Sequence, residues 1–376
     1  MAATLGRIEE QFEGGDPHGA LGELGELVAE VASRSEAERA RLLAELTARL
    51  DHEQPALGAH FALAAGALVE GGLPAEELAE ALLEPVARAV TSAARFVDLA
   101  ERYPDEPGAL DGDDDAVEVG TRTLSGESLA AIADEDDDAV ASYFALDTWH
   151  HPVVTAWSRD LRALAAAQSD ASLSAALRAL AGRSEGAEWL WRLLRAPVSA
   201  PFVVLVPELE TGFSARVTGA ADVAQLLVLL ADELAEVVAR LGASPPPRAV
   251  VETMRGQGAQ QAEAVWSTPL RLHPGSSLDP ATGMPARASS RWAIAGRAQP
   301  EADTSLTLES SPGEIETSGA QRVVVLVGGR VAGGAPLEVP AARTFPALGA
   351  RLDELAELAP EALAAVKRKL FASKAS

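Results

Sequence analysis

The sequence predicts an α+β protein, with a helical N-terminal bundle or short solenoid followed by a mixed domain whose mostly antiparallel sheet is flanked by helices. Three observations predict this class. Apolar residues recur at helical spacing through the first hundred residues. Short apolar runs separated by turns follow in the second half, without the regular strand–helix alternation of a doubly wound sheet. The 376 residues are enough for about two domains.

Residues 1–102 are expected to form an all-helical domain. A leucine stripe that includes Leu42 and Leu46 follows Ser35, which we expect to be a helix N-cap. An alanine-rich segment stops at Gly71, and Pro74 opens another helix at its first turn.

The composition changes at residues 103–119, where proline, glycine and aspartate predict an acidic linker. Residues 120–376 are then expected to contain a helical segment and the α+β domain. The next helix should begin after Ser125 as its N-cap, and the chain should turn a corner at His151-Pro152, because a residue before proline disfavours the helical conformation.

The second half begins with a predicted hairpin of strands 202–206 and 213–217, followed by a long helix at 223–241. Further strands are predicted at 264–272, 291–295, 305–308 and 322–327, and a last helix at 348–370 with a break near Pro360. Strands joined by short turns favour antiparallel pairing.

The residue counts exclude several function classes. Cysteine is absent, which excludes disulfides, thiolate nucleophiles and Cys-ligated metals. The lysines are Lys367, Lys369 and Lys374, so a P-loop, a kinase or a pyridoxal-phosphate enzyme would lack its lysine inside the fold. A net charge of −25 argues against nucleic acid as a partner.

One polar cluster has the residue types of a catalytic or metal site. Asp147 precedes His150 and His151 by three and four residues, on one helical face. Asp147 and His151 form a candidate acid–base pair, in which the carboxylate fixes the imidazole tautomer. Asp147, His150 and His151 are also candidate ligands of Zn or Mn. The third interpretation is structural, with the histidines capping a helix–helix corner.

Other motifs favour structural interpretations. The glycine pairs at 327–334 lack the spacing of a dinucleotide site. The Gly126–Ala130 segment resembles a nucleophile elbow but follows a polar segment. The acidic run at 111–115 lacks the glycine and glutamate of a calcium loop. The run at 134–138 is expected to precede a helix, where acids favour the positive end of the helix dipole.

From these observations we expect a cytoplasmic protein-interaction or scaffold protein without intrinsic catalysis. Its partner would be another protein, bound through apolar helical faces or the basic tail Lys367–Ser376, with no membrane or nucleic acid involved. The cytoplasmic location is expected because no secretory signal or membrane-spanning stretch is evident. The first alternative is a metal-dependent or acid–base hydrolase centred on Asp147, His150 and His151. The second is a small-molecule binding domain that uses Trp266 or Trp292. The arginine-rich, alanine-rich composition suggests a GC-rich bacterial genome.

Overall fold

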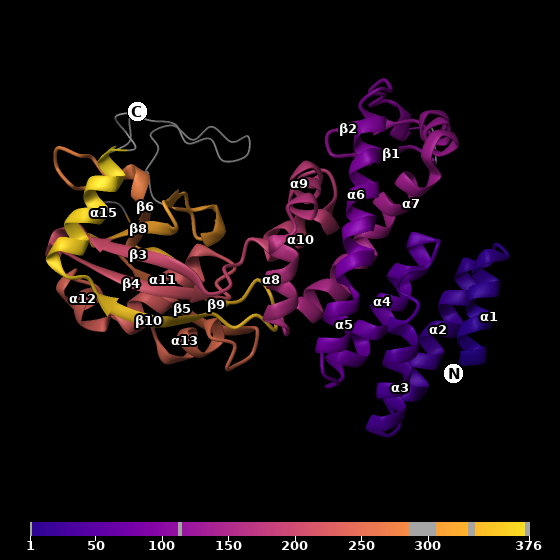
Figure 1. Cartoon of the computed structure of the whole chain (residues 1–376), viewed down its shortest axis with the longest axis horizontal. Coiled ribbons are helices and arrows are strands. Elements are labelled where there is room, and N and C mark those ends of the chain that lie inside the picture. The colour runs from indigo at the N-terminus through magenta and orange to yellow at the C-terminus, as the bar shows by residue number, and fades with distance from the viewer. Residues whose placement is uncertain (1, 112–114, 286–305, 330–334, 373–376) are drawn as a thin grey trace. The chain divides into compact units, whose positions relative to one another are not determined.

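The computed structural model describes residues 2–111, 115–285, 306–329 and 335–372. The chain divides into two compact units, Met1–Leu194 (unit 1) and Arg195–Ser376 (unit 2) (Figure 1). Helices come first and a mixed domain with antiparallel strand pairs follows, which confirms the predicted α+β class. Within the described ranges, no helix is both long and apolar enough to cross a bilayer.

Unit 1 is helical apart from one short β-hairpin. Its elements are α1 (Ala2–Glu13), α2 (Pro17–Ala32), α3 (Glu36–Thr47), α4 (Pro55–Glu70), α5 (Glu76–Ala81), α6 (Leu83–Ala100), β1 (Val117–Val119), β2 (Arg122–Leu124), α7 (Gly126–Trp157), α8 (Leu161–Ser169), α9 (Ala171–Leu180) and α10 (Glu185–Leu194).

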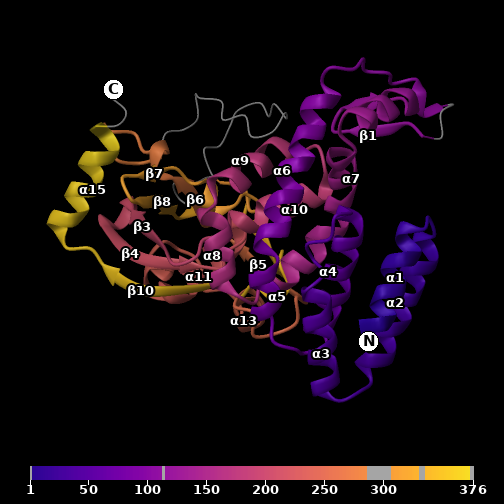
Figure 2. The same cartoon turned by 45° about the vertical axis from the view of Figure 1, so that its right-hand side comes forward.

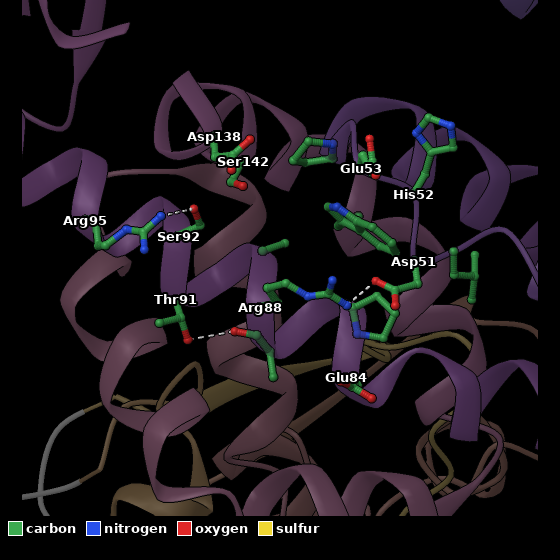
Figure 3. Close-up of a pocket in the computed structure, with 16 residues that line it drawn as sticks. Asp51, His52, Glu53, Glu84, Arg88, Thr91, Ser92, Arg95, Asp138 and Ser142 are labelled. Carbon is green, nitrogen blue, oxygen red and sulfur yellow. Dashed lines mark hydrogen bonds and ion pairs between the residues drawn. The ribbon is translucent and has the colours of Figure 1, made fainter. Parts of the chain in front are cut away.

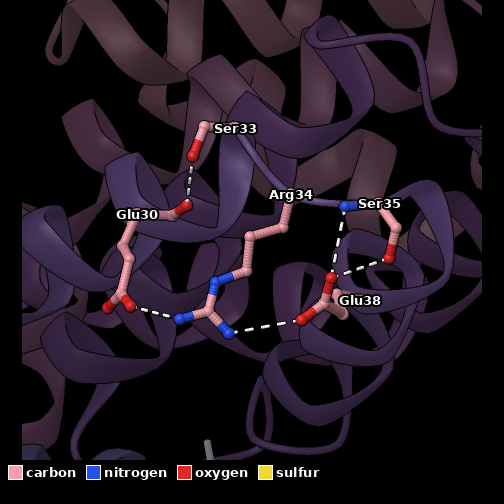
Figure 4. Close-up of polar contacts among 5 residues, drawn as sticks. All are labelled: Glu30, Ser33, Arg34, Ser35 and Glu38. Carbon is pink, nitrogen blue, oxygen red and sulfur yellow. Dashed lines mark hydrogen bonds and ion pairs between the residues drawn. The ribbon is translucent and has the colours of Figure 1, made fainter.

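Polar side chains fix the corner between α2 and α3 (Figure 4). Ser35 is the N-cap of α3, as predicted, and the Glu38 carboxylate accepts hydrogen bonds from the Ser35 backbone N–H at 3.2 Å and from its Oγ at 2.7 Å. These bonds lower the pKa of Glu38. Arg34 forms ion pairs with both Glu30 and Glu38, so one guanidinium connects the two helices.

Helix α7 is the central element of unit 1. Ser125 caps its start, as predicted. The helix is kinked at Asp136, where φ is −155° and ψ is 82°, and the Asp136 carboxylate caps the following segment by accepting from the Ala139 N–H at 3.0 Å. The predicted corner at His151-Pro152 is wrong, because α7 continues through Pro152 to Trp157. Gly66 of α4 lies against this proline: a Cβ there would be 3.1 Å from Pro152 Cα.

The two units meet in sequence at residues 194–195, whereas composition places a linker at 103–119. Helices α6 and α7, on either side of that stretch, share one core. The rings of Phe96 and Tyr143 have centroids 4.7 Å apart, and Arg102 pairs with Glu135 at 2.9 Å. A loop composition reveals a turn of the chain, but it does not reveal whether the helices on its two sides pack together.

Unit 2 contains the sheets. Its elements are β3 (Ala200–Val206), β4 (Thr211–Thr218), α11 (Val223–Glu233), α12 (Ala235–Arg240), α13 (Arg248–Met254), β5 (Gln261–Thr268), β6 (Arg271–Pro274), β7 (Thr317–Ser318), β8 (Gln321–Val327), β9 (Leu337–Ala342), β10 (Arg351–Glu357) and α15 (Pro360–Ala372).

The larger sheet has the strand order β10-β4-β3-β8-β6, with β7 beside β8. The pairs in this sheet are antiparallel except β3–β8, which is parallel. The predicted hairpin is confirmed as β3 and β4, with Phe202 opposite Ala215. A separate antiparallel pair is formed by β5 and β9.

Both faces of the larger sheet are covered (Figures 1 and 2). On one face, Val204 and Val324 pack with the apolar side of α11 and with α12 and α13. On the other, Val203 and Val325 pack with Leu363 and Leu370 of α15. Strand residues therefore alternate between two cores, and α15 is the helix that lies on the second face.

The structure corrects several sequence predictions in unit 2. The sequence predicts one helix at 348–370, whereas residues 351–357 form strand β10 and helix α15 begins only at Pro360. Pairing with β4 outweighs the helical pattern of this segment, although β10 has a bulge where Glu354 adopts a φ of 54°. The helix at 223–241 is interrupted at Leu234, and the strand at 264–272 is two strands. Residues 306–308 are not in a strand. The predicted strand at 291–295 lies outside the described residues.

Candidate functional site

Asp147, His150 and His151 lie in the middle of α7, on the stretch that precedes Pro152. The sequence places Asp147 and His151 on the apolar arc of this helix. In the structure, both side chains are exposed and His150 is half-buried, while the neighbouring Tyr143 and Trp149 are buried. The apolar arc is therefore rotated away from the candidate residues.

The Asp147 carboxylate holds two helices together. Its Oδ1 accepts a hydrogen bond of 2.9 Å from the backbone N–H of Gly186, at the start of α10. The first N–H groups of a helix lack intrahelical acceptors, so this carboxylate acts as a cap supplied by another helix. Nearby, the Tyr143 hydroxyl donates to the backbone carbonyl of Arg183, and burial raises the pKa of Tyr143 to about 12. Asp147 thus has a structural partner.

The two histidines stack on one another. Their ring centroids are 3.9 Å apart and the rings are inclined by 35°. Burial, followed by the charge interaction with His151, lowers the pKa of His150. No hydrogen bond or ion pair joins Asp147 to His151 among the described residues, and within them no three His, Asp or Glu side chains are placed to hold a metal ion.

A larger feature of unit 1 is an open groove of about 1070 Å³ (Figure 3). It lies between the loop after α3, the first half of α6 and the middle of α7. The lining residues are Leu50, Asp51, His52, Glu53, Pro55, Glu84, Pro85, Ala87, Arg88, Ala89, Thr91, Ser92, Arg95, Asp138, Ser142 and Trp149. We call this the unit 1 groove.

The two arginines and the histidine of the unit 1 groove already have carboxylate partners. Arg88 pairs with Asp51, Arg95 lies 3.2 Å from Asp136, and His52 lies 3.8 Å from a carboxylate of α1. Each carboxylate partner can neutralise its cation, so these groups leave no uncompensated positive charge in the groove.

Three carboxylates of the groove have no such partner. Glu53, Glu84 and Asp138 are exposed, and among the described residues none of them forms an ion pair or a hydrogen bond (Figure 3). They come from three separate elements, so their proximity depends on the packing of α6 against α7 and on the loop before α4. The unit 1 groove is therefore net negative.

Trp149 supplies a buried donor in the wall of the groove. The residue is only 2% exposed, and its Nε1 has no hydrogen-bond partner within the described structure. Buried side-chain donors usually have an acceptor, and leaving one unpaired costs about 1–3 kcal/mol. The groove thus combines unpaired carboxylates with an unpaired indole N–H.

The remaining sequence candidates lie in unit 2. Trp266, a residue of β5, is buried in the core and donates its indole N–H to the Ser244 carbonyl at 3.2 Å, which gives it a structural partner. Trp292 lies outside the described residues. The described part of the basic tail, 367–372, belongs to α15.

The acidic charge is concentrated in one unit. Unit 1 contains 37 Asp and Glu against 14 Arg, a net charge of −23, whereas unit 2 contains 19 acidic and 17 basic residues, a net charge of −2. A field of this size attracts cations to unit 1 from solution and repels polyanions.

Sequence reasoning did not find the unit 1 groove. Glu53, Glu84 and Asp138 are far apart in the chain and belong to no motif, and exposed acids occur on the solvent face of many helices. The one usable signal is the acid excess of the first 194 residues. Comparison of the chain with protein-family models, with curated proteins and with solved structures finds no match.

Proposed function

We propose that this chain is a non-catalytic protein-interaction protein whose unit 1 groove binds a cationic stretch of a partner polypeptide. The observation that carries the proposal is the set of three unpaired carboxylates, Glu53, Glu84 and Asp138, in a groove whose own cations are neutralised. Lysine or arginine side chains of a partner would supply the missing counter-charges, and complementary charges favour both encounter and register.

The shape of the groove supports a polypeptide as the ligand. Typical small-molecule pockets bury most of the ligand surface and have few polar groups. This groove is open, and ten of its 16 lining residues are polar or charged.

Nucleic acid does not suit this surface. A net charge of −23 on unit 1 repels a phosphate backbone, and the arginines of the groove are committed to carboxylates of the same chain. The electrostatics therefore favour a basic partner.

The test uses the full chain and a fluorescein-labelled twelve-residue peptide made of four Lys-Ala-Ala repeats. Fluorescence anisotropy at 50 mM salt should show binding, and the Glu-Ala-Ala counterpart should not bind. The triple variant Glu53→Gln, Glu84→Gln, Asp138→Gln should bind roughly three- to 150-fold more weakly, because each lost ion pair removes about 0.2–1 kcal/mol.

The matched control is the variant Glu10→Gln, Glu26→Gln, Glu80→Gln. It removes the same charge from exposed positions of unit 1 that do not line the groove. We expect the control to change the dissociation constant by less than about twofold, because none of its three carboxylates lines the groove and exposed charges are screened by salt. Equal weakening by the two triples, or no binding of the basic peptide, would refute the proposal.

The hydrolase centred on Asp147, His150 and His151 is the rival assignment. It has less support, because the Asp147 carboxylate is bonded to Gly186 and does not contact His151 in the described structure. A general base needs its orienting partner within hydrogen-bond reach. The rival is tested separately below by metal analysis.

A further inference from the structure

Helix α15 carries the positive charge that the unit 1 groove lacks. Lys367, Arg368 and Lys369 are consecutive, and none of them forms an ion pair among the described residues. Leu363 and Leu370 anchor the helix to the sheet, since both are buried in the same core. Residues at this spacing share one helical face, so the anchoring leaves Arg368 and Lys369 exposed and Lys367 half-buried.

We propose that the occupant of the unit 1 groove is the basic segment Lys367–Lys369 of a second copy of this chain. The inference rests on the proposed function and names its partner. Lys367 lies on the anchored side of the helix, between Leu363 and Leu370, so Arg368 and Lys369 are the exposed cations of this segment. The groove offers three unpaired carboxylates. A preformed helix loses little conformational entropy when it docks, which favours this segment over an unstructured one.

The charge distribution favours this orientation of two copies. Contact between two copies of unit 1 would bring together two net charges of −23, whereas unit 2 carries only −2 and has three consecutive basic residues on α15. Electrostatic steering therefore directs unit 2 of one copy toward unit 1 of another. Such a contact joins unlike surfaces, so repeated docking produces rings or open chains of copies rather than a symmetric pair.

Sedimentation equilibrium of the full chain, from about 1 to 200 µM at 50 mM salt, tests the proposal. The weight-average mass should rise above 39.0 kDa with concentration, and 0.5 M salt should reduce the rise. Association should weaken about three- to 150-fold in either of two triple variants, Lys367→Gln, Arg368→Gln, Lys369→Gln or Glu53→Gln, Glu84→Gln, Asp138→Gln. The control Glu10→Gln, Glu26→Gln, Glu80→Gln should associate as the native chain does.

Charge reversal gives the decisive comparison. Two charge-reversal variants should each remain at the monomer mass, because groove and helix then carry like charge. The groove variant is Glu53→Lys, Glu84→Lys, Asp138→Lys, and the helix variant is Lys367→Glu, Arg368→Glu, Lys369→Glu. Mixing the two variants should restore association, because each groove again meets a helix of opposite charge. Circular dichroism verifies that both variants are folded.

The outcomes separate the two proposals. A chain that stays at 39.0 kDa at every concentration, yet binds the Lys-Ala-Ala peptide, overturns self-association and leaves the proposed function standing. Association that neither triple reduces, or that mixing the reversed variants does not restore, also overturns it. Failure of the basic peptide to bind would remove the proposed function itself.

Discussion

Gly186 is the point of closest approach between α10 and α7, and replacing it with alanine tests the packing of unit 1. A Cβ at this position would lie 2.4 Å from the Leu146 carbonyl oxygen, 2.6 Å from its carbon and 2.9 Å from the Asp147 nitrogen. All three are backbone atoms of α7, so no side chain can rotate away. To reach a normal contact of about 3.5 Å, α10 must move by roughly 1 Å.

The expected magnitude follows from opposing effects. Alanine in place of glycine favours a helix by about 0.5–1 kcal/mol. Overpacking a close contact costs about 1–3 kcal/mol, and moving α10 also lengthens the 2.9 Å bond from the Gly186 N–H to Asp147, which contributes about 1 kcal/mol. We therefore expect Gly186→Ala to lower the free energy of unfolding by about 1–3 kcal/mol.

Urea unfolding followed by far-ultraviolet circular dichroism measures this change. The control is Gly25→Ala, within α2, where an added Cβ meets no atom within 4 Å. This control should raise the free energy of unfolding by about 0.5–1 kcal/mol, because only the helix preference changes. If Gly186→Ala stabilises the chain as much as Gly25→Ala does, the close approach of α10 to α7 is refuted.

Three further outcomes are expected. Asp147→Asn retains an acceptor for the Gly186 N–H and should leave the free energy of unfolding nearly unchanged, whereas Asp147→Ala should lower this free energy by about 1 kcal/mol. A stoichiometric metal found by elemental analysis, and lost equally in both variants, would support the hydrolase instead. Trp157→Phe removes a buried hydrogen bond of 3.0 Å to a carbonyl of α5, whereas Trp149→Phe removes an indole N–H that has no partner in the described structure. Trp157→Phe should therefore lower the free energy of unfolding by about 1–3 kcal/mol more than Trp149→Phe does. Equal shifts in the urea midpoint would contradict this. Burial acts to raise the pKa of Asp160, but the hydrogen bonds that it accepts at the start of α8 lower it overall. The ionised Asp160 therefore stabilises the fold above the unfolded pKa of about 3.9, and this contribution is lost as the pH falls through the lower folded pKa. Between pH 5 and pH 2, the Asp160→Asn variant should lose less stability than the native chain. An identical loss would show that Asp160 does not contribute.

Local features of the fold were determined by the sequence alone. Ser35 and Ser125 cap helices in the structure as predicted, because a capping side chain bonds to backbone groups only two or three residues away. Strands β3 and β4 form the predicted hairpin, since their apolar runs are separated by one short turn. These choices depend on neighbours in the chain, so they can be predicted without knowledge of the tertiary structure.

Other features were decided by contacts between distant residues. Pro152 stays inside α7, packed against Gly66, and residues 351–357 form a strand because β4 supplies hydrogen-bond partners. Asp147 caps α10 rather than orienting His151, and the three carboxylates of the unit 1 groove meet only when α6 and α7 pack together. Helical periodicity reports which side of a segment is apolar, but the partner that covers that side is set by the packing of the whole unit. The charge excess of unit 1 was therefore present in the sequence, while the place where it remains unpaired was determined by the tertiary structure.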